Sequence, residues 1–254
     1  MFAELEGKVV LVTGSSTGIG AAAARAFGKV GAHVVVHYAR SRDKAEAVAE
    51  AIRADGAKAS VVSGDVSVPG GAEAVVAAAI QAAGTLHVLI NNAGHMVERR
   101  PWADYTDAAY DAILNLNARS AAAASAAAIP EFRRNGKGNI IHVSSIAARN
   151  GGSGGAGLYA AAKGFVSTMT RGMARELAPL NIRVNAVSPG VIMTPFHEIY
   201  STPEQLAAAK ATIPMGRLGT AEDCAGTFLY LACDALSGYV TGQVIEVNGG
   251  QLMP

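Results

Sequence analysis

Short runs of apolar, largely β-branched residues alternate with alanine-rich stretches along most of the chain. The runs occupy 9–12, 34–36, 60–62, 88–90, 140–143, 182–187 and 244–247. Apolar runs of this kind are typical of strands buried on both faces, and strands separated by helices pair in parallel through right-handed crossovers. The alternation therefore predicts an α/β fold, a doubly wound parallel sheet of about seven strands with helices on both faces.

The stretches between the strands carry helical patterns, with glycines where helices are expected to end. Gly31, Gly56 and Gly84 follow three of these stretches directly. No linker divides the 254 residues, so we expect one domain over 1–254. The segments 151–157 and 193–214 break the alternation, and long loops after strands are often lids or binding loops. The predicted helices span 18–30, 42–55, 70–83, 107–134, 157–178 and 220–232.

Charge and composition exclude several classes of function. The formal net charge is +1 and no basic stripe occurs, so no nucleic-acid partner is expected. No apolar segment suits a membrane span and no basic, apolar leader opens the chain, which predicts a cytoplasmic protein without a membrane partner. The two cysteines, Cys224 and Cys233, are interpreted as reduced, packed thiols, and the six histidines lack metal-ligand spacing, so no metal is predicted.

A glycine-rich turn links the first strand to the first helix. The sequence there is Thr13-Gly14-Ser15-Ser16-Thr17-Gly18-Ile19-Gly20. Glycines let the backbone approach a pyrophosphate, and the helix N-terminus offers unpaired N–H groups. The position predicts dinucleotide binding and a Rossmann-type domain, although the G-x-x-x-G-x-G spacing differs from the usual G-x-G-x-x-G. The alternative is a tight turn without a ligand.

The end of the second strand indicates which dinucleotide is bound. An acidic residue here accepts hydrogen bonds from a ribose 2′-hydroxyl, whereas arginine accommodates a 2′-phosphate. The sequence reads Val36-His37-Tyr38-Ala39-Arg40-Ser41-Arg42, with no carboxylate before Asp43. Arg40 and Ser41 therefore favour NADP(H), and NAD(H) remains possible because both arginines could simply solvate a helix start.

A tyrosine and a lysine stand four residues apart on the helix expected over 157–178. This spacing places Tyr159 and Lys163 on one helix face, within reach of a shared ligand. A free tyrosine has a pKa near about 10, and a nearby cation favours its phenolate. The alternative is an ordinary interface tyrosine beside a surface lysine.

At this point the chain resembles the classical short-chain dehydrogenase/reductase family over essentially its whole length. Eight segments match the family in order. They are Thr13–Gly20, Gly64-Asp65-Val66, Asn91-Asn92-Ala93-Gly94, Asn117, Val143-Ser144-Ser145, Tyr159–Lys163, Val187-Ser188-Pro189-Gly190 with Thr194, and Val247-Asn248-Gly249-Gly250. The resemblance implies a dinucleotide-binding half over about 1–95 and a catalytic half over about 96–254, with a substrate loop at 193–214.

The resemblance also implies a role for each matched residue. Tyr159 is the general acid or base, Lys163 supplies charge and binds the nicotinamide ribose, Ser145 holds the substrate oxygen and Asn117 anchors a water. Ser144 and Asn115 are the rivals of Ser145 and Asn117. The implied cofactor-binding residues are Gly14, Ser16, Thr17, Gly18, Ile19, Gly20, Arg40, Ser41, Asp65, Val66, Asn91, Ala93, Gly94, Tyr159, Lys163, Pro189, Gly190, Ile192 and Thr194.

Three functions are weighed on this basis. The first is NADPH-dependent reduction of a ketone or 3-oxoacyl thioester, in which Arg133, Arg134 and Lys137 could contact an acyl carrier protein. The second is a sugar or polyol dehydrogenase of the glucose-dehydrogenase type, and the third a non-catalytic redox sensor. Hydride transfer to or from a small-molecule carbonyl or alcohol is common to the first two.

The resemblance also implies self-association to a homotetramer, with a dimer as the alternative, through the helices at 107–134 and 157–178 and the strand at 244–247. The substrate wall is expected to combine apolar and polar side chains. Its candidate members are His95, Met96, Trp102, Leu158, Met193, Phe196, His197 and Tyr200.

Overall fold

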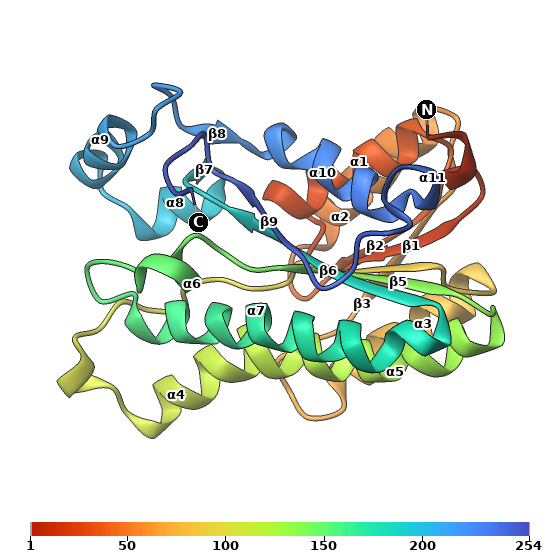
Figure 1. Cartoon of the computed structure of the whole chain (residues 1–254), viewed down its shortest axis with the longest axis horizontal. Coiled ribbons are helices and arrows are strands. Elements are labelled where there is room, and N and C mark those ends of the chain that lie inside the picture. Colours follow the sequence, from red (N-terminus) through yellow and green to blue (C-terminus); the bar gives the residue numbers. More distant parts are fainter. Residues whose placement is uncertain (1, 254) are drawn as a thin grey trace.

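The computed structural model describes residues 2–253 and is built on one central sheet (Figure 1). Seven strands lie in the order β3-β2-β1-β4-β5-β6-β9, and every neighbouring pair is parallel. The predicted doubly wound parallel sheet is therefore confirmed. The strands are β1 (Val9–Val12), β2 (His33–Tyr38), β3 (Ala59–Ser63), β4 (Val88–Asn91), β5 (Gly138–Val143), β6 (Ile182–Pro189) and β9 (Val244–Val247).

Helices cover both faces of the sheet because each crossover returns the chain across it. Successive residues of β1 divide between the two layers: Val10 and Val12 pack in one apolar cluster with Phe27, and Leu11 packs in the other with Phe132. Figure 1 shows the two layers above and below the sheet. One layer contains α1 (Gly18–Lys29), α2 (Arg42–Ala54) and α10 (Ala221–Ala232), and the other contains α3 (Gly71–Ala83), α5 (Ser120–Arg134) and α7 (Gly157–Leu177).

The helix predicted over 107–134 is interrupted. It comprises α4 (Asp107–Leu114), a π-helical turn η3 (Asn115–Arg119) and then α5. A π turn inserts one extra residue into the helical ladder, which a pattern of apolar spacing does not reveal, and such turns often occur at functional sites. Here the turn contains Asn117.

Of the two segments predicted as loops, 151–156 has no helix or strand, whereas 193–214 contains short elements. After Gly190 the chain forms β7 (Ile192–Met193), α8 (Pro195–Tyr200) and α9 (Pro203–Ala211), so the loop expected over 193–214 is largely helical. Both helices begin with proline, which is pre-organised for the first helical position. The remaining elements are α6 (Ala147–Asn150), β8 (Gly219–Thr220), α11 (Asp234–Ser237) and three 3₁₀ turns (Ala3–Leu5, Trp102–Asp104 and Ala178–Leu180).

The sequence predicts neither a membrane-spanning helix nor a metal site. Over 2–253, no helix combines the length and apolar character that a membrane crossing needs. The same residues contain no group of three or more histidine, cysteine, aspartate or glutamate side chains arranged to hold a metal. Cys224 and Cys233 are buried and free.

Candidate active site

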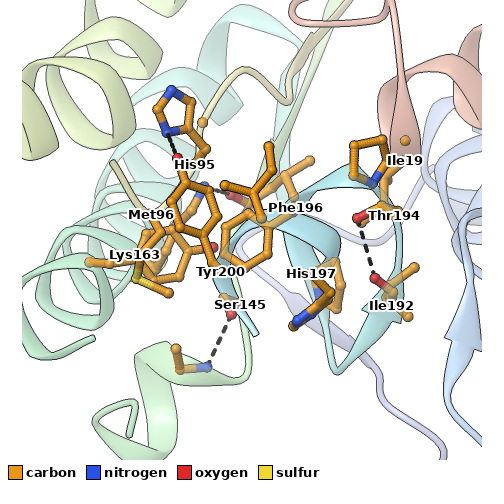
Figure 2. Close-up of a pocket in the computed structure, with 18 of the residues that line it drawn as sticks. Ile19, His95, Met96, Ser145, Lys163, Ile192, Thr194, Phe196, His197 and Tyr200 are labelled. Atoms are coloured by element: carbon orange, nitrogen blue, oxygen red, sulfur yellow. Dashed lines mark hydrogen bonds between the residues drawn. The ribbon is translucent and has the colours of Figure 1, made fainter. Parts of the chain in front are cut away.

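A cleft of about 840 Å³ opens at the carboxyl edge of the sheet. The strand order reverses between β1 and β4, and ligands of open α/β sheets bind beside such a reversal. The cleft extends from the glycine-rich turn to α8 and α9, and Figure 2 shows its α8 end. Most of the residues named from the sequence line it; Asn117, Gly20 and Asn91 do not.

The glycine-rich turn is held against β4 by side chains and a close backbone contact. Gly14 has φ +64°, and a Cβ there would lie 2.9 Å from the Cα of Ala93. Asn92 Nδ2 donates to the carbonyls of Thr13 and Gly14, at 2.9 and 3.0 Å. Glycine is therefore required where the turn meets β4, and the cradle that this leaves at the start of α1 fits a pyrophosphate.

His37 also holds the turn, a role that the sequence did not reveal. Its Nδ1 accepts from the Gly14 N–H at 2.9 Å and its Nε2 lies 3.0 Å from the Gly64 carbonyl, which it can reach only as donor. Burial lowers the pKa of His37, which keeps the ring neutral in this tautomer. The signal in the sequence was a histidine in the buried run of β2, which alone reads as a core side chain.

Two residues expected at the cofactor lie beside the cleft instead of in it. Asn91 donates through Nδ2 to Ser125 Oγ at 2.9 Å and lies 3.2 Å from His142 Nδ1, so its side chain faces the interior and cannot meet an adenosine ribose. This corrects the prediction for Asn91. Gly20 packs under the turn, where a Cβ would lie 2.4 Å from Asn92 Nδ2.

The adenosine end of the cleft has one cation and one anion. Arg40, Ser41, Asp65 and Val66 all line it. The pKa of Asp65 is lowered, first by hydrogen bonds from Ser67 and then by the charge of Arg40, although burial opposes the shift. Arg40 is exposed and has no carboxylate within 4.0 Å among residues 2–253, so its guanidinium is available to a phosphate.

Tyr159 and Lys163 lie on the cleft side of α7. Lys163 Nζ donates to the Val143 carbonyl at 2.8 Å and lies 5.8 Å from the centre of the Tyr159 ring. Burial raises the pKa of Tyr159 to about 12, against a lowering by its hydrogen bond with Ser145, and burial lowers the pKa of Lys163 to about 8. At neutral pH the pair is therefore a phenol beside an ammonium, a proton donor with a cation ready to stabilise the phenolate.

The two serines that follow β5 have different surroundings. Ser144 is buried, where its Oγ donates to the Lys163 carbonyl at 3.1 Å and lies 2.7 Å from Ser167 Oγ. Ser145 is half-buried and lines the cleft, its Oγ accepts from the Ala147 N–H at 3.1 Å, and its hydroxyl opposes the rise in the pKa of Tyr159. Both serines line the cleft, but the hydroxyl of Ser144 is hydrogen-bonded to α7.

The two asparagines of the π turn also have different hydrogen-bond partners. Asn115 accepts from Arg119. Asn117 is buried, and its Nδ2 donates to the carbonyls of His95 and Ile113 at 2.9 and 3.0 Å. Its Oδ1 has no hydrogen-bond partner among residues 2–253, so one buried acceptor is free at the end of the amide.

Gly94 brings Asn117 and Lys163 together. A Cβ at Gly94 would lie 2.7 Å from Asn117 Oδ1 and 3.2 Å from Lys163 Nζ. The free acceptor and the ammonium therefore flank the same small space at the cleft floor. The relay expected of Asn117 requires its Oδ1 near Lys163, and both groups lie beside Gly94.

Four residues expected at the cofactor lie at the end of β6 or after it. Pro189, Gly190, Ile192 and Thr194 line the cleft, and a Cβ at Gly190 would lie 2.7 Å from the Cβ of Asn248. Thr194 reaches across to the glycine-rich turn, because a Cβ at Gly18 would lie 3.4 Å from its side chain. These residues and the turn form opposite walls of a single groove.

Aromatic side chains from α8 cover Tyr159. The Phe196 ring lies 5.8 Å from the Tyr159 ring and 5.2 Å from Tyr200, which stacks on His95 at 6.0 Å with Oη 3.1 Å from Nδ1 (Figure 2). Of the predicted wall, five residues line the cleft: His95, Met96, Phe196, His197 and Tyr200. The other three do not line it: Trp102 and Met193 are exposed, and Leu158 packs in a separate core cluster.

Comparisons with known proteins cover almost the whole chain. The family described as enoyl-(acyl carrier protein) reductase matches residues 14–251. An uncharacterized oxidoreductase of Methylorubrum extorquens is 41% identical over 249 residues, covering 97% of this chain and 98% of the relative. Human dehydrogenase/reductase SDR family member 4 is 37% identical (97% and 88%), and a 3-oxoacyl-[acyl-carrier-protein] reductase of Staphylococcus aureus is 36% identical (97% and 98%).

Solved structures of other proteins also match this chain over nearly its whole length. An NADH-dependent reductase A1-R′, described as complexed with NAD, superposes with a TM-score of 0.89 at 34% identity and full coverage of both chains. A putative NAD(P)-dependent gluconate 5-dehydrogenase from Beutenbergia cavernae, described with bound NADP, superposes with a TM-score of 0.90 at 34% identity, covering 97% of each chain. Both nicotinamide cofactors therefore occur among the similar structures.

Proposed function

Because the chain belongs to the short-chain dehydrogenase/reductase family, whose members are NAD(P)-dependent oxidoreductases, we propose that it reduces a ketone or 3-oxoacyl thioester with NADPH. The observation that carries the proposal is the arrangement of Tyr159, Ser145 and Lys163 around one end of the cleft. A phenol, a hydroxyl and an ammonium directed at one oxygen suit reversible proton transfer to a carbonyl.

Each side chain has a distinct task in this proposal. Ser145 hydrogen-bonds the substrate oxygen and Tyr159 gives it a proton, while the charge of Lys163 stabilises the resulting phenolate. Asn117 Oδ1 anchors a water through which Tyr159 regains its proton. The nicotinamide cofactor, when bound, supplies the hydride.

NADPH is preferred over NADH in this proposal because of the charge at the adenosine end. Tyr38 ends β2 where a carboxylate would bind a ribose diol, and Arg40 lies in the cleft without a carboxylate partner among residues 2–253. A similar structure binds NAD, so the preference needs a direct test.

Fluorescence titration with NADPH and NADH tests the preference. We expect NADPH to bind at least about tenfold more tightly, and Arg40→Ala to remove most of that difference while leaving NADH affinity within about twofold. Arg42→Ala is the matched control, because Arg42 starts α2 without lining the cleft. Equal affinities in the unaltered protein, or an equal effect of both substitutions, would contradict the role of Arg40.

Replacing Tyr159 with Phe tests the chemistry. NADPH consumption with a panel of ketones and oxoacyl thioesters is expected to fall by at least about 10²-fold, with NADPH affinity nearly unchanged. Turnover that survived the substitution would refute the role of Tyr159. A cellular function that survived loss of turnover would favour the redox-sensor alternative.

Sugar or polyol oxidation is the second candidate function. The substrate end of the cleft has hydrogen-bonding side chains, His95, His197, Tyr200 and Gln205, that suit a polyhydroxylated molecule, and one similar structure is described as a gluconate 5-dehydrogenase. Turnover of polyols with NADP⁺ or NAD⁺, in the absence of ketone reduction, would favour it.

The Staphylococcus aureus relative supports an acyl carrier protein as partner. The basic residues that could contact it, Arg133, Arg134 and Lys137, are partly neutralised by neighbouring carboxylates. Lys137 Nζ lies 3.0 Å from Asp234 Oδ2, and Arg134 pairs with Glu131. Arg133 is exposed and has no carboxylate within 4.0 Å among residues 2–253. We therefore expect free or coenzyme-linked substrates to be reduced without a carrier protein, which the same NADPH assay tests.

A further inference from the structure

Arg99 connects three segments around the substrate end of the cleft. Its Nε donates to the Tyr200 carbonyl at 2.8 Å, and its Nη1 donates to the carbonyls of Ser153 and Gly154 at 2.7 and 3.1 Å. One guanidinium thereby ties the irregular segment that follows Gly94 to the glycine-rich segment 151–157 and to the end of α8. Arg99 also lines the cleft.

These three bonds leave the charge of Arg99 uncompensated. Its partners are neutral carbonyls, and among residues 2–253 no carboxylate lies within 4.0 Å of its guanidinium. Within the same residues, Nη2 and its two hydrogens make no hydrogen bond. The charge of Arg99 acts on the neighbouring His197 and, after burial, contributes to lowering its pKa. A partly buried cation without a counter-ion favours an anionic ligand.

A second donor lies beside this guanidinium. Gln205 Oε1 accepts from the Thr202 N–H at 3.0 Å in the capping box of α9, which fixes Nε2 as the other end of the amide. A Cβ at Gly154 would lie 3.5 Å from Gln205 Nε2 and 3.6 Å from Arg99 Nη1, so both donors flank Gly154. Gln205 lines the cleft, and its Nε2 donates to no group among residues 2–253.

The donors lie at a distance from the reacting oxygen. Phe196 and Tyr200 form two successive ring contacts between Tyr159 and the carbonyl that Arg99 holds. A group bound at Arg99 is therefore separated from the carbonyl at Tyr159 by several bonds. The only carboxylate lining the cleft, Asp65, is hydrogen-bonded to Ser67 at the adenosine end, so among the described lining residues no acid faces the substrate end.

We propose that Arg99 and Gln205 bind an anionic oxygen group of the substrate, carried several bonds away from the carbonyl that is reduced. The group is either the carboxylate of a free oxo acid or the phosphate of a phosphopantetheine-linked thioester. This inference rests on the proposed reductase function, because it names the class of substrate for the same cleft.

Two matched substrate pairs test it, each comparing an anion with a neutral analogue. The first pair is 5-oxohexanoate and its methyl ester, and the second is acetoacetyl-coenzyme A and the acetoacetyl thioester of N-acetylcysteamine. We expect kcat/KM to favour the anionic member of at least one pair by about tenfold or more. The pair that shows the preference identifies the carboxylate or the phosphate as the source of the charge.

Four variants separate charge recognition from the structural tie. Arg99→Gln is expected to lower kcat/KM for the anionic member by about tenfold more than for the neutral analogue and so to remove the preference, and Arg99→Lys is expected to keep part of it. Gln205→Glu preserves the acceptor for Thr202 but places a negative charge beside Arg99, so it should also weaken the preference. Arg100→Gln is the control: Arg100 pairs with Glu98 at 2.7 Å and does not line the cleft.

Calorimetry separates failure of this inference from failure of the reductase function. Binding of each substrate to the NADP⁺ complex is measured for the same variants, so the preference is scored even if no ketone is turned over. Equal binding and turnover of anionic and neutral analogues in the unaltered protein would overturn the inference. Equal losses for both analogues in Arg99→Gln would also overturn it, because Arg99 would then only tie the segments together.

Discussion

A methyl group at Gly94 is expected to separate the two polar groups at the floor of the cleft. The added Cβ would lie 2.7 Å from Asn117 Oδ1, closer than a carbon and an oxygen can approach without movement. Asn117 cannot turn away easily, because its Nδ2 is held by the backbone carbonyls of His95 and Ile113. The strain falls on Asn117 and on Lys163 Nζ, which would lie 3.2 Å from the new carbon.

The magnitude follows from overpacking in a rigid site. Inserting a methyl group into such a site lowers the stability of the folded protein by about 1–3 kcal/mol. Displacing catalytic groups by about 1 Å lowers turnover by about 10²-fold. We therefore expect Gly94→Ala to lower kcat for ketone reduction by about 10²-fold with a smaller change in KM. Stopped-flow or steady-state NADPH oxidation measures this, with chemical denaturation to follow stability.

Gly226→Ala is the matched control for this substitution. Gly226 is an exposed residue within α10, and a Cβ there would meet nothing within 4 Å. Alanine should raise stability by about 0.5–1 kcal/mol and leave kcat unchanged. A kcat for Gly94→Ala within about twofold of the unaltered protein would refute the reasoning, because Asn117 and Lys163 would then tolerate the displacement.

Three further predictions address charge, packing and assembly. Burial lowers the pKa of Lys163 to about 8, so its ammonium form predominates below this pH. We therefore expect kcat for reduction to fall as the pH rises through about 8. A kcat that stays constant from about pH 6 to about pH 10 would contradict the role of the charge. Phe132 of α5 is fully buried against the sheet, so Phe132→Ala should lower the free energy of unfolding by about 3–5 kcal/mol. A denaturation midpoint near that of the unaltered protein would count against the assigned core. We also expect a homotetramer, with a mass by light scattering of four times 25.8 kDa, and a mass of 25.8 kDa at micromolar concentration would exclude it.

The sheet and its long helices could be predicted because their signals are local. Runs such as Val9–Val12 are apolar without interruption, and Gly31, Gly56 and Gly84 adopt positive φ after the helices they were expected to end. The π turn around Asn117 had no such signal. Its extra residue changes the helical ladder without changing the apolar spacing, so 107–134 looked like one helix.

The candidate site was predictable where side chains act from fixed positions on regular elements. Tyr159 and Lys163 share a face of α7 because they are four residues apart, and Ser145 and Gly190 follow strands that end at the same sheet edge. Asn91 was assigned to the cofactor through the family resemblance, but successive residues at the end of a strand face opposite sides. Only Asn92 reaches the glycine-rich turn.

The sequence by itself determined the order of strands and helices, the glycine-rich turn and the tyrosine–lysine pair, because each depends on residues only a few positions apart. Tertiary structure alone decided the different surroundings of the two serines and of the two asparagines, and it brought His37 to Gly14 and Arg99 to α8. These contacts join residues that are 23 and 101 positions apart. In both contacts the partner of the side chain is a backbone N–H or carbonyl group. Because almost every residue carries these groups, no pattern of side chains could predict the contacts.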